Sequence, residues 1–281
     1  MMLKIVTDGG ADFPDHWQEL YQIYMIPLRV QFGERTYIQG LDIGTDNFYQ
    51  LVKEYKIIPK TSLPSPGQIM DFYRSITNPG DEVLSVHLGS KLSGTFSTVQ
   101  LAAKELIGEI QVYPFDSSAG SAALAMMCRE ARLIEQAGGS ISDILKKLEI
   151  IRERLLVVFT IDTLEFARMN GRVNAMQSVV ASALRIKPIV ILRDGLLQMA
   201  DKVRTRQRAI EQIVDYARSQ IGMKSVDIAV VHAADPQMAQ WLIEKVRQVF
   251  NCHELIATEL SIPVAANLGP GAVGIILYPV E

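Results

Sequence analysis

The sequence predicts an α/β protein of two domains: an N-terminal domain with a mostly parallel sheet and helices on both faces, and a C-terminal α/β domain with a mixed sheet that contains an antiparallel hairpin. Three observations support this prediction. Apolar β-rich runs alternate with amphipathic segments through the first half, an order typical of parallel sheets with crossover helices. In the second half, two β-like runs flank Asp194-Gly195, a dipeptide typical of hairpins. The 281 residues, 48% of them hydrophobic, suffice for more than one core.

Each predicted element of the first half has a local signal. The run at 3–7 is short and apolar, and the turn-forming Asp8-Gly9-Gly10 follows it. Helices are predicted where apolar residues recur at helical spacing, as in 47–55. The predicted strands are 3–7, 25–32, 82–88 and 110–115, and the predicted helices are 15–21, 47–55, 68–76, 98–106, 120–136 and 140–154.

From residue 155 the order of elements changes, because the strands on either side of Asp194-Gly195 must pair antiparallel. The predicted strands are 156–161, 188–192, 196–200, 226–232, 254–259 and 273–278, and the predicted helices are a short one ending near 169, 175–185, 206–221 and 236–250. We place the domain boundary near residue 153, so that 1–153 and 154–281 form the two domains. The loop and helix at 59–78 can contribute to the other domain.

Polar loops follow three of the predicted parallel strands, at 8–12, 89–95 and 116–118. Because the carboxyl ends of parallel strands meet at one edge of the sheet, we expect these loops on one rim, where ligands bind in such folds. The stretch Ser85–Ser97 is the richest of them in hydroxyl groups and glycines, which suit the binding of an oxyanion. Taken alone, hydroxyl groups before a helix favour helix capping over ligand binding.

A second hydroxyl-rich segment, Pro59–Gly67, contains three prolines. Proline lacks a backbone donor, so we expect a stiffened loop here rather than a helix interior or a central strand. This loop presents Thr61, Ser62 and Ser65 before the helix at 68–76.

Composition and charge exclude several classes of function. The net charge of −3 and the absence of a long basic run disfavour nucleic acid or an anionic membrane surface as partner. Cys128 and Cys252 lie far apart in apolar settings, and the four histidines lack metal-ligand spacing, so we expect neither a disulfide framework nor a metal site. No apolar run reaches the length of a transmembrane helix, and no signal peptide is visible, which favours a cytoplasmic protein.

Several local motifs leave alternatives open. A hydrolase or transferase that uses Ser93 as nucleophile remains possible, although Leu92-Ser93-Gly94-Thr95 lacks the form of a nucleophile elbow. The basic run 202–208 is either a ligand-facing element or a solvated surface. The segment 267–271 contains Gly269-Pro270-Gly271, which forms either a ligand-facing loop or a plain turn.

Together these motifs resemble the DegV family, in the family's order and over the whole chain. They are Thr7-Asp8, Ala11-Asp12, Pro14, Thr61-Ser62, Pro64-Ser65, Leu92-Ser93-Gly94-Thr95, Asp116-Ser117, Gly171-Arg172, Ile186-Lys187-Pro188, Asp194-Gly195, Lys202-Val203-Arg204 and Gly269-Pro270-Gly271. The resemblance implies a non-enzymatic carrier that holds one long-chain fatty acid in a tunnel between two domains. It also implies a partner, an ATP-dependent fatty acid kinase that phosphorylates the bound carboxylate.

The resemblance also implies roles for individual residues. The family's carboxylate contacts map onto Thr61 and Ser93, and we include their neighbours in the predicted carboxylate site, which comprises Thr61, Ser62, Ser93, Gly94 and Thr95. The predicted phosphoryl-transfer or partner-facing residues are Arg172, Arg204 and Asn267. Guanidinium groups suit developing phosphate charge. We expect a monomer without cofactor, whose ligand is the fatty acid. With the resemblance, ligand binding becomes the preferred role of Ser93 over helix capping.

The chain departs from the family at several positions. Gly9 replaces a serine, Asn170 replaces a glycine before Gly171-Arg172, and Asn267 stands where the family commonly has a histidine. Asparagine can hydrogen-bond an oxyanion, but it cannot carry a positive charge or a proton. The sequence therefore favours lipid binding more strongly than productive phosphorylation, and a lipid-binding protein without a kinase is an alternative.

Overall fold

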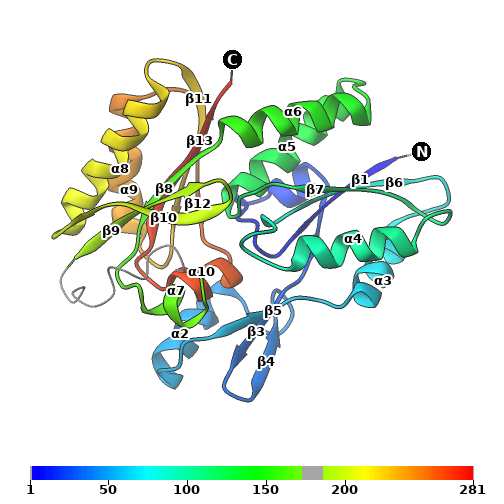
Figure 1. The fold of residues 1–281 in the computed structure, drawn as a ribbon, viewed down its shortest axis with the longest axis horizontal. Coiled ribbons are helices and arrows are strands. Elements are labelled where there is room, and N and C mark those ends of the chain that lie inside the picture. The colour runs from blue at the N-terminus through cyan, green and yellow to red at the C-terminus, as the bar shows by residue number, and fades with distance from the viewer. Residues whose placement is uncertain (1, 173–185, 281) are drawn as a thin grey trace.

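The computed structural model describes residues 2–172 and 186–280, and within them the chain forms two large sheets and one small sheet (Figure 1). The predicted helix at 175–185 lies outside the described residues. The first sheet is entirely parallel, in the order β2-β1-β6-β7. Its strands are β1 (Leu3–Asp8), β2 (Ile23–Ile26), β6 (Glu82–His87) and β7 (Gln111–Asp116).

Helices cover both faces of this parallel sheet, as predicted. Successive strand residues point to opposite faces, so Val6 packs among residues of α3 (Pro66–Ile76) and α4 (Thr95–Glu105). Its neighbour Ile5 packs among residues of α5 (Ala122–Gln136), against which α6 (Ile141–Arg154) lies.

The second sheet is mixed, in the order β10-β9-β8-β13-β11-β12, and only β11 and β12 pair in parallel. The predicted hairpin is confirmed, because Asp194 (φ 53°) and Gly195 (φ 73°) both adopt the positive φ of a tight hairpin turn. The strands are β8 (Leu156–Thr160), β9 (Lys187–Arg193), β10 (Leu196–Val203), β11 (Ser225–His232), β12 (Asn251–Glu259) and β13 (Val273–Pro279).

The two faces of the mixed sheet have different neighbours. Helices α8 (Arg206–Ile221) and α9 (Pro236–Val249) bury residues such as Val158 and Ile275. On the opposite face, Val157, Phe159 and Ile276 belong to the same apolar cluster as residues of α5 and α6. The mixed sheet therefore presents one of its faces to the first domain.

The prediction of one strand over 25–32 is wrong, because Pro27 divides this run. The part before it is β2 of the parallel sheet, and the part after it is β3 (Arg29–Phe32) of the small sheet. The small sheet is antiparallel, in the order β4-β3-β5, with β4 (Arg35–Ile38) and β5 (Lys60–Ser62). The sequence predicts a loop at Lys60–Ser62. These residues form an edge strand instead, a position that tolerates nearby prolines.

The remaining helices are α1 (Trp17–Leu20), α2 (Thr45–Tyr55), α7 (Glu165–Met169) and α10 (Ile262–Leu268). No helix was predicted at the position of α10, which contacts α7, β3 and β5. It thereby joins the small sheet to the C-terminal part of the chain. The proposed domain boundary at residue 153 falls at the end of α6 and stays a prediction. Among the described residues, no helix is long and apolar enough to cross a membrane.

Candidate functional site

The three loops at the carboxyl ends of the parallel strands meet on one rim, as expected. The Leu88 amide donates to Asp8 Oδ2 (3.0 Å), the Gly89 amide donates to the Ala119 carbonyl (2.7 Å), and the Ser121 amide donates to the Gly10 carbonyl (2.8 Å). Hydrogen bonds thus connect the loop after β6 to the loops after β1 and β7.

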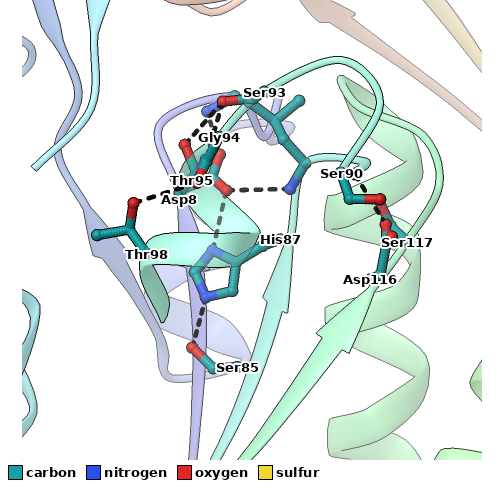
Figure 2. Close-up of polar contacts among 12 residues, drawn as sticks. Asp8, Ser85, His87, Ser90, Ser93, Gly94, Thr95, Thr98, Asp116 and Ser117 are labelled. Carbon is teal, nitrogen blue, oxygen red and sulfur yellow. Dashed lines mark hydrogen bonds and ion pairs between the residues drawn. The ribbon is translucent and has the colours of Figure 1, made fainter. Parts of the chain in front are cut away.

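Ser93 lies in the rim loop between β6 and α4 (Figure 2). Its Oγ accepts a hydrogen bond from the Thr95 amide (3.2 Å) and lies 2.9 Å from Thr95 Oγ1. Ser93 therefore contacts the first amide of α4, much as the capping interpretation expected, although Gly94 occupies the cap position itself. When the Thr95 hydroxyl donates to Ser93 Oγ, the Ser93 proton is free for a further acceptor.

A cavity lies beside this loop and contains about 940 Å³ of space, including the part open to solvent. Residues from both domains line it, and most of them are apolar, such as Leu28, Leu88, Val157, Phe159, Leu197 and Ile276. These apolar residues were not predicted as site residues, because nothing in the sequence distinguishes them from core residues.

Four of the predicted site residues meet in the lining of this cavity: Thr61 on β5, Ser93 in the rim loop, Arg172 after α7, and Asn267 on α10. Arg172 is an exposed residue, and its Nε donates to the Leu92 carbonyl (3.2 Å). The cavity therefore collects side chains that are more than 200 positions apart in the sequence.

The other predicted residues lie outside this lining. Gly94 lines an adjoining hollow that shares Ser93 and Arg172 with the cavity. Thr95 is buried and contacts Ser93, so it can only support the site. Ser62 and Arg204 are exposed and line neither space. The roles of these four residues remain predictions.

Asn170 connects two elements that contribute to the cavity wall. Its Nδ2 donates to the Pro59 carbonyl next to β5 (3.2 Å) and to the Ala266 carbonyl of α10 (3.0 Å). These bonds place Thr61 and Asn267 on neighbouring elements.

A buried chain of polar side chains lies beneath the rim (Figure 2). Asp8 Oδ2 contacts His87 Nδ1 (2.9 Å), His87 Nε2 contacts Ser85 Oγ (2.6 Å), and Ser85 Oγ contacts Tyr73 Oη (2.8 Å). The connectivity resembles a catalytic triad, but all four residues are 0% exposed. Its histidine bonds Ser85 rather than Ser93, so the geometry offers Ser93 no paired base among these groups.

Asp12 and Ser121 form a second buried polar contact, and Ser121 lines the cavity. Ser121 has a strained backbone conformation, with φ 64° and ψ −144° at the start of α5. Asp12 accepts hydrogen bonds from the Ser121 hydroxyl and from the Ser261 amide. Burial nevertheless dominates and raises the pKa of the Asp12 carboxyl from 3.8 to about 6.

Two motifs of the C-terminal half, the basic run 202–208 and the segment Gly269-Pro270-Gly271, make structural contacts within the protein. Arg206 of the basic run binds Asp162 (2.6 Å) and Asp235. The amides of Gly269 and Gly271 donate to carbonyls within the protein, at 2.8 Å each, which fits the plain-turn interpretation. Within residues 2–172 and 186–280, no group of three or more histidine, cysteine or acidic side chains could hold a metal ion.

Fold and cavity together define a two-domain α/β protein with an apolar cavity and a few polar groups in its wall. The DegV family model, described as "Uncharacterised protein, DegV family", matches residues 2–280. The chain belongs to the DegV family. The protein DegV of Bacillus subtilis is 33% identical over 280 residues, which cover 98% of each chain.

Solved structures agree with this assignment. A fatty acid-binding DegV family protein from Thermus thermophilus has a TM-score of 0.92 and 30% identity, with 100% of both chains covered. DegV of Bacillus subtilis, described as a fatty acid binding protein, has a TM-score of 0.89 and 31% identity, with 99% of both chains covered. The predicted fold class and family are thereby confirmed.

Proposed function

We propose that this protein binds one long-chain fatty acid in the cavity between its domains and presents the carboxylate to an ATP-dependent fatty acid kinase. The observation that carries the proposal is the meeting of Thr61 and Ser93 in the wall of a mostly apolar cavity. The fatty acid-binding relatives from Thermus thermophilus and Bacillus subtilis, which share 30% and 31% identity with this chain, support the same ligand class.

The two parts of the cavity wall suit the two parts of a fatty acid. Burying a methylene contributes about 0.8 kcal/mol, so about fifteen methylenes contribute roughly 12 kcal/mol before the costs of ordering. A carboxylate removed from water needs hydrogen-bond donors, and the hydroxyls of Thr61 and Ser93 are available for that role. The apolar wall therefore provides the affinity, and the hydroxyls fix the orientation.

In this proposal the chain carries no catalytic residue of its own. Arg172 lines both the cavity and the adjoining hollow, where its guanidinium can face the carboxylate as phosphate charge develops. The kinase step rests on the family resemblance alone. A lipid carrier without a kinase remains the alternative, because Asn267 replaces the family histidine.

Native mass spectrometry of protein purified from a bacterial host tests lipid binding. We expect an adduct of fatty acid mass that disappears on denaturation. In titrations with oleate, Thr61→Ala combined with Ser93→Ala should weaken binding by roughly a hundredfold or more, since two hydrogen bonds to a charged group are lost. The matched control is Thr36→Ala with Ser97→Ala, two exposed hydroxyls outside the cavity.

A clean apo mass without uptake of oleate would overturn the proposal, and equal affinities of the two double variants would remove Thr61 and Ser93 from the site. The kinase step is examined by adding a fatty acid kinase subunit and ATP and measuring acyl phosphate with the wild type and with Asn267→His. Rapid covalent labelling of Ser93 by a serine-directed probe would favour the hydrolase alternative instead.

A further inference from the structure

Asn267 lines the cavity, and its side-chain amide oxygen is a buried hydrogen-bond acceptor without a donor. Its Nδ2 lies 2.7 Å from the Pro263 carbonyl, one turn earlier in α10. A carbonyl can only accept, so the amide nitrogen must face Pro263 and the amide oxygen must turn away from it. Asn267 Oδ1 is buried and receives no hydrogen bond from any residue that the structure describes.

The printed hydrogen bonds of the neighbouring Asn170 and Arg172 go to backbone carbonyls and not to Asn267. The Asn170 amide nitrogen donates to the carbonyls of Pro59 and Ala266. Arg172 directs Nε to the Leu92 carbonyl and Nη1 to the Asn170 carbonyl. A buried acceptor without a partner is unfavourable, so a donor on the bound ligand would relieve it.

We infer that Asn267 selects long-chain ligands whose head group donates a hydrogen bond, such as a fatty primary amide, a fatty alcohol or an undissociated fatty acid. The inference rests on the proposed lipid site and names the chemistry of its head-group end. A carboxylate has only acceptor atoms and cannot satisfy Asn267 Oδ1. A histidine, which the family commonly has here, can donate through a ring nitrogen, whereas the amide oxygen of Asn267 can only accept.

Arg172 favours the opposite kind of head group, one with a negative charge. Among the described residues that line the cavity, it carries the only charged side chain, and a guanidinium favours an anion. Arg172 is exposed, so solvent screens its charge. The test of Asn267 therefore compares the ratio of ligand affinities between the wild type and variants at residue 267. It does not ask which ligand the wild type binds most tightly.

The experiment compares oleate, oleamide and oleyl alcohol, which share one acyl chain, as competitors of a fluorescent long-chain fatty acid at one neutral pH. Relative to oleate, Asn267→Leu should weaken oleamide and oleyl alcohol by about tenfold, the effect of one buried hydrogen bond. Asn267→His should shift selectivity further toward oleate. The matched control is Asn251→Leu, the same change at an exposed position of β12.

Equal ratios of the three affinities in the wild type and in Asn267→Leu, with oleate binding intact, would overturn this inference and leave the proposed function standing. Failure of the wild type to bind any of the three would overturn the lipid site itself. Circular dichroism verifies the fold of each variant, and Asn267→Ala provides the same comparison if Asn267→Leu does not fold.

Discussion

Asp12 is a carboxyl group that is only 2% exposed, and its pKa of about 6 has consequences for stability. Between its ordinary value of 3.8 and about 6, the native protein binds a proton that the unfolded chain has lost. The contribution of Asp12 to stability is therefore largest at low pH and is lost as the pH rises through this window. At 1.36 kcal/mol per pH unit, the rise from 3.8 to about 6 amounts to about 3 kcal/mol.

We therefore expect Asp12→Asn to gain stability relative to the wild type by up to about 3 kcal/mol as the pH rises from about 4 to about 7. Urea denaturation of both proteins over this range measures the difference in the free energy of unfolding. A difference that stays constant with pH would contradict the assigned pKa.

The prediction of individual site residues was uneven, for chemical reasons. Thr61, Ser93, Arg172 and Asn267 belong to motifs that resemble the family, and they meet in one cavity. Phe159 and Ile276 line the same cavity, but in the sequence they look like ordinary strand residues. Only the folded arrangement separates a side chain that faces a cavity from one that faces another side chain.

Among the elements, the hairpin of β9 and β10 depends on its turn. Gly195 has φ 73°, and an added methyl group would meet only ordinary contacts, the nearest 3.5 Å away at Lys91. Gly195→Ala should therefore lose about 1–2 kcal/mol through backbone strain rather than steric collision.

The control for this substitution is Gly67→Ala in α3, where nothing lies closer than 4.0 Å and alanine is the better helix former. Chemical denaturation should show a loss for Gly195→Ala and a gain of up to about 1 kcal/mol for Gly67→Ala. A loss of similar size in both variants would contradict the explanation by backbone conformation.

The accuracy of element prediction followed the strength of local signals. The long buried strands and the Asp194-Gly195 turn have strong signals and were found. Strand β4 has exposed residues at Arg35 and Thr36 and lacks the apolar alternation that identifies a strand. Its pairing with β3 comes from the tertiary structure, as does the assignment of residues on either side of Pro27 to different sheets.

At the scale of the whole molecule, Arg129 connects α5 to the mixed sheet. It is 5% exposed, binds Asp227 of β11 (2.9 Å) and Glu254 of β12, and lies over the ring of Trp17. The Tyr278 hydroxyl also donates to Asp227 (3.0 Å). Neither sequence spacing nor composition predicts such a contact, because Arg129 lies about 100 positions or more from Asp227, Glu254, Trp17 and Tyr278.

We expect Arg129→Met to destabilise the protein by about 3–5 kcal/mol, because buried Asp227 would lose the Arg129 cation and keep only Tyr278 and His253 as side-chain partners. Adding Asp227→Asn should recover part of the loss. Arg208→Met, which removes an exposed pair with Glu211, is the control and should cost at most about 1 kcal/mol. Urea denaturation compares the variants, and equal losses at both arginines would rule out a special role for the buried network.

The buried hydrogen-bonded side chains from Asp8 to Tyr73 affect the entropic cost of ligand binding at the proposed site. The Leu88 amide donates to Asp8, and Asp8 is itself held by His87, so the start of the Ser93 loop is anchored from below (Figure 2). The loop is thereby preorganised when the protein folds, and a ligand of the proposed site would not bear the entropic cost of ordering it. Affinity at the proposed site would then report the contacts of the ligand itself, with little contribution from loop rearrangement.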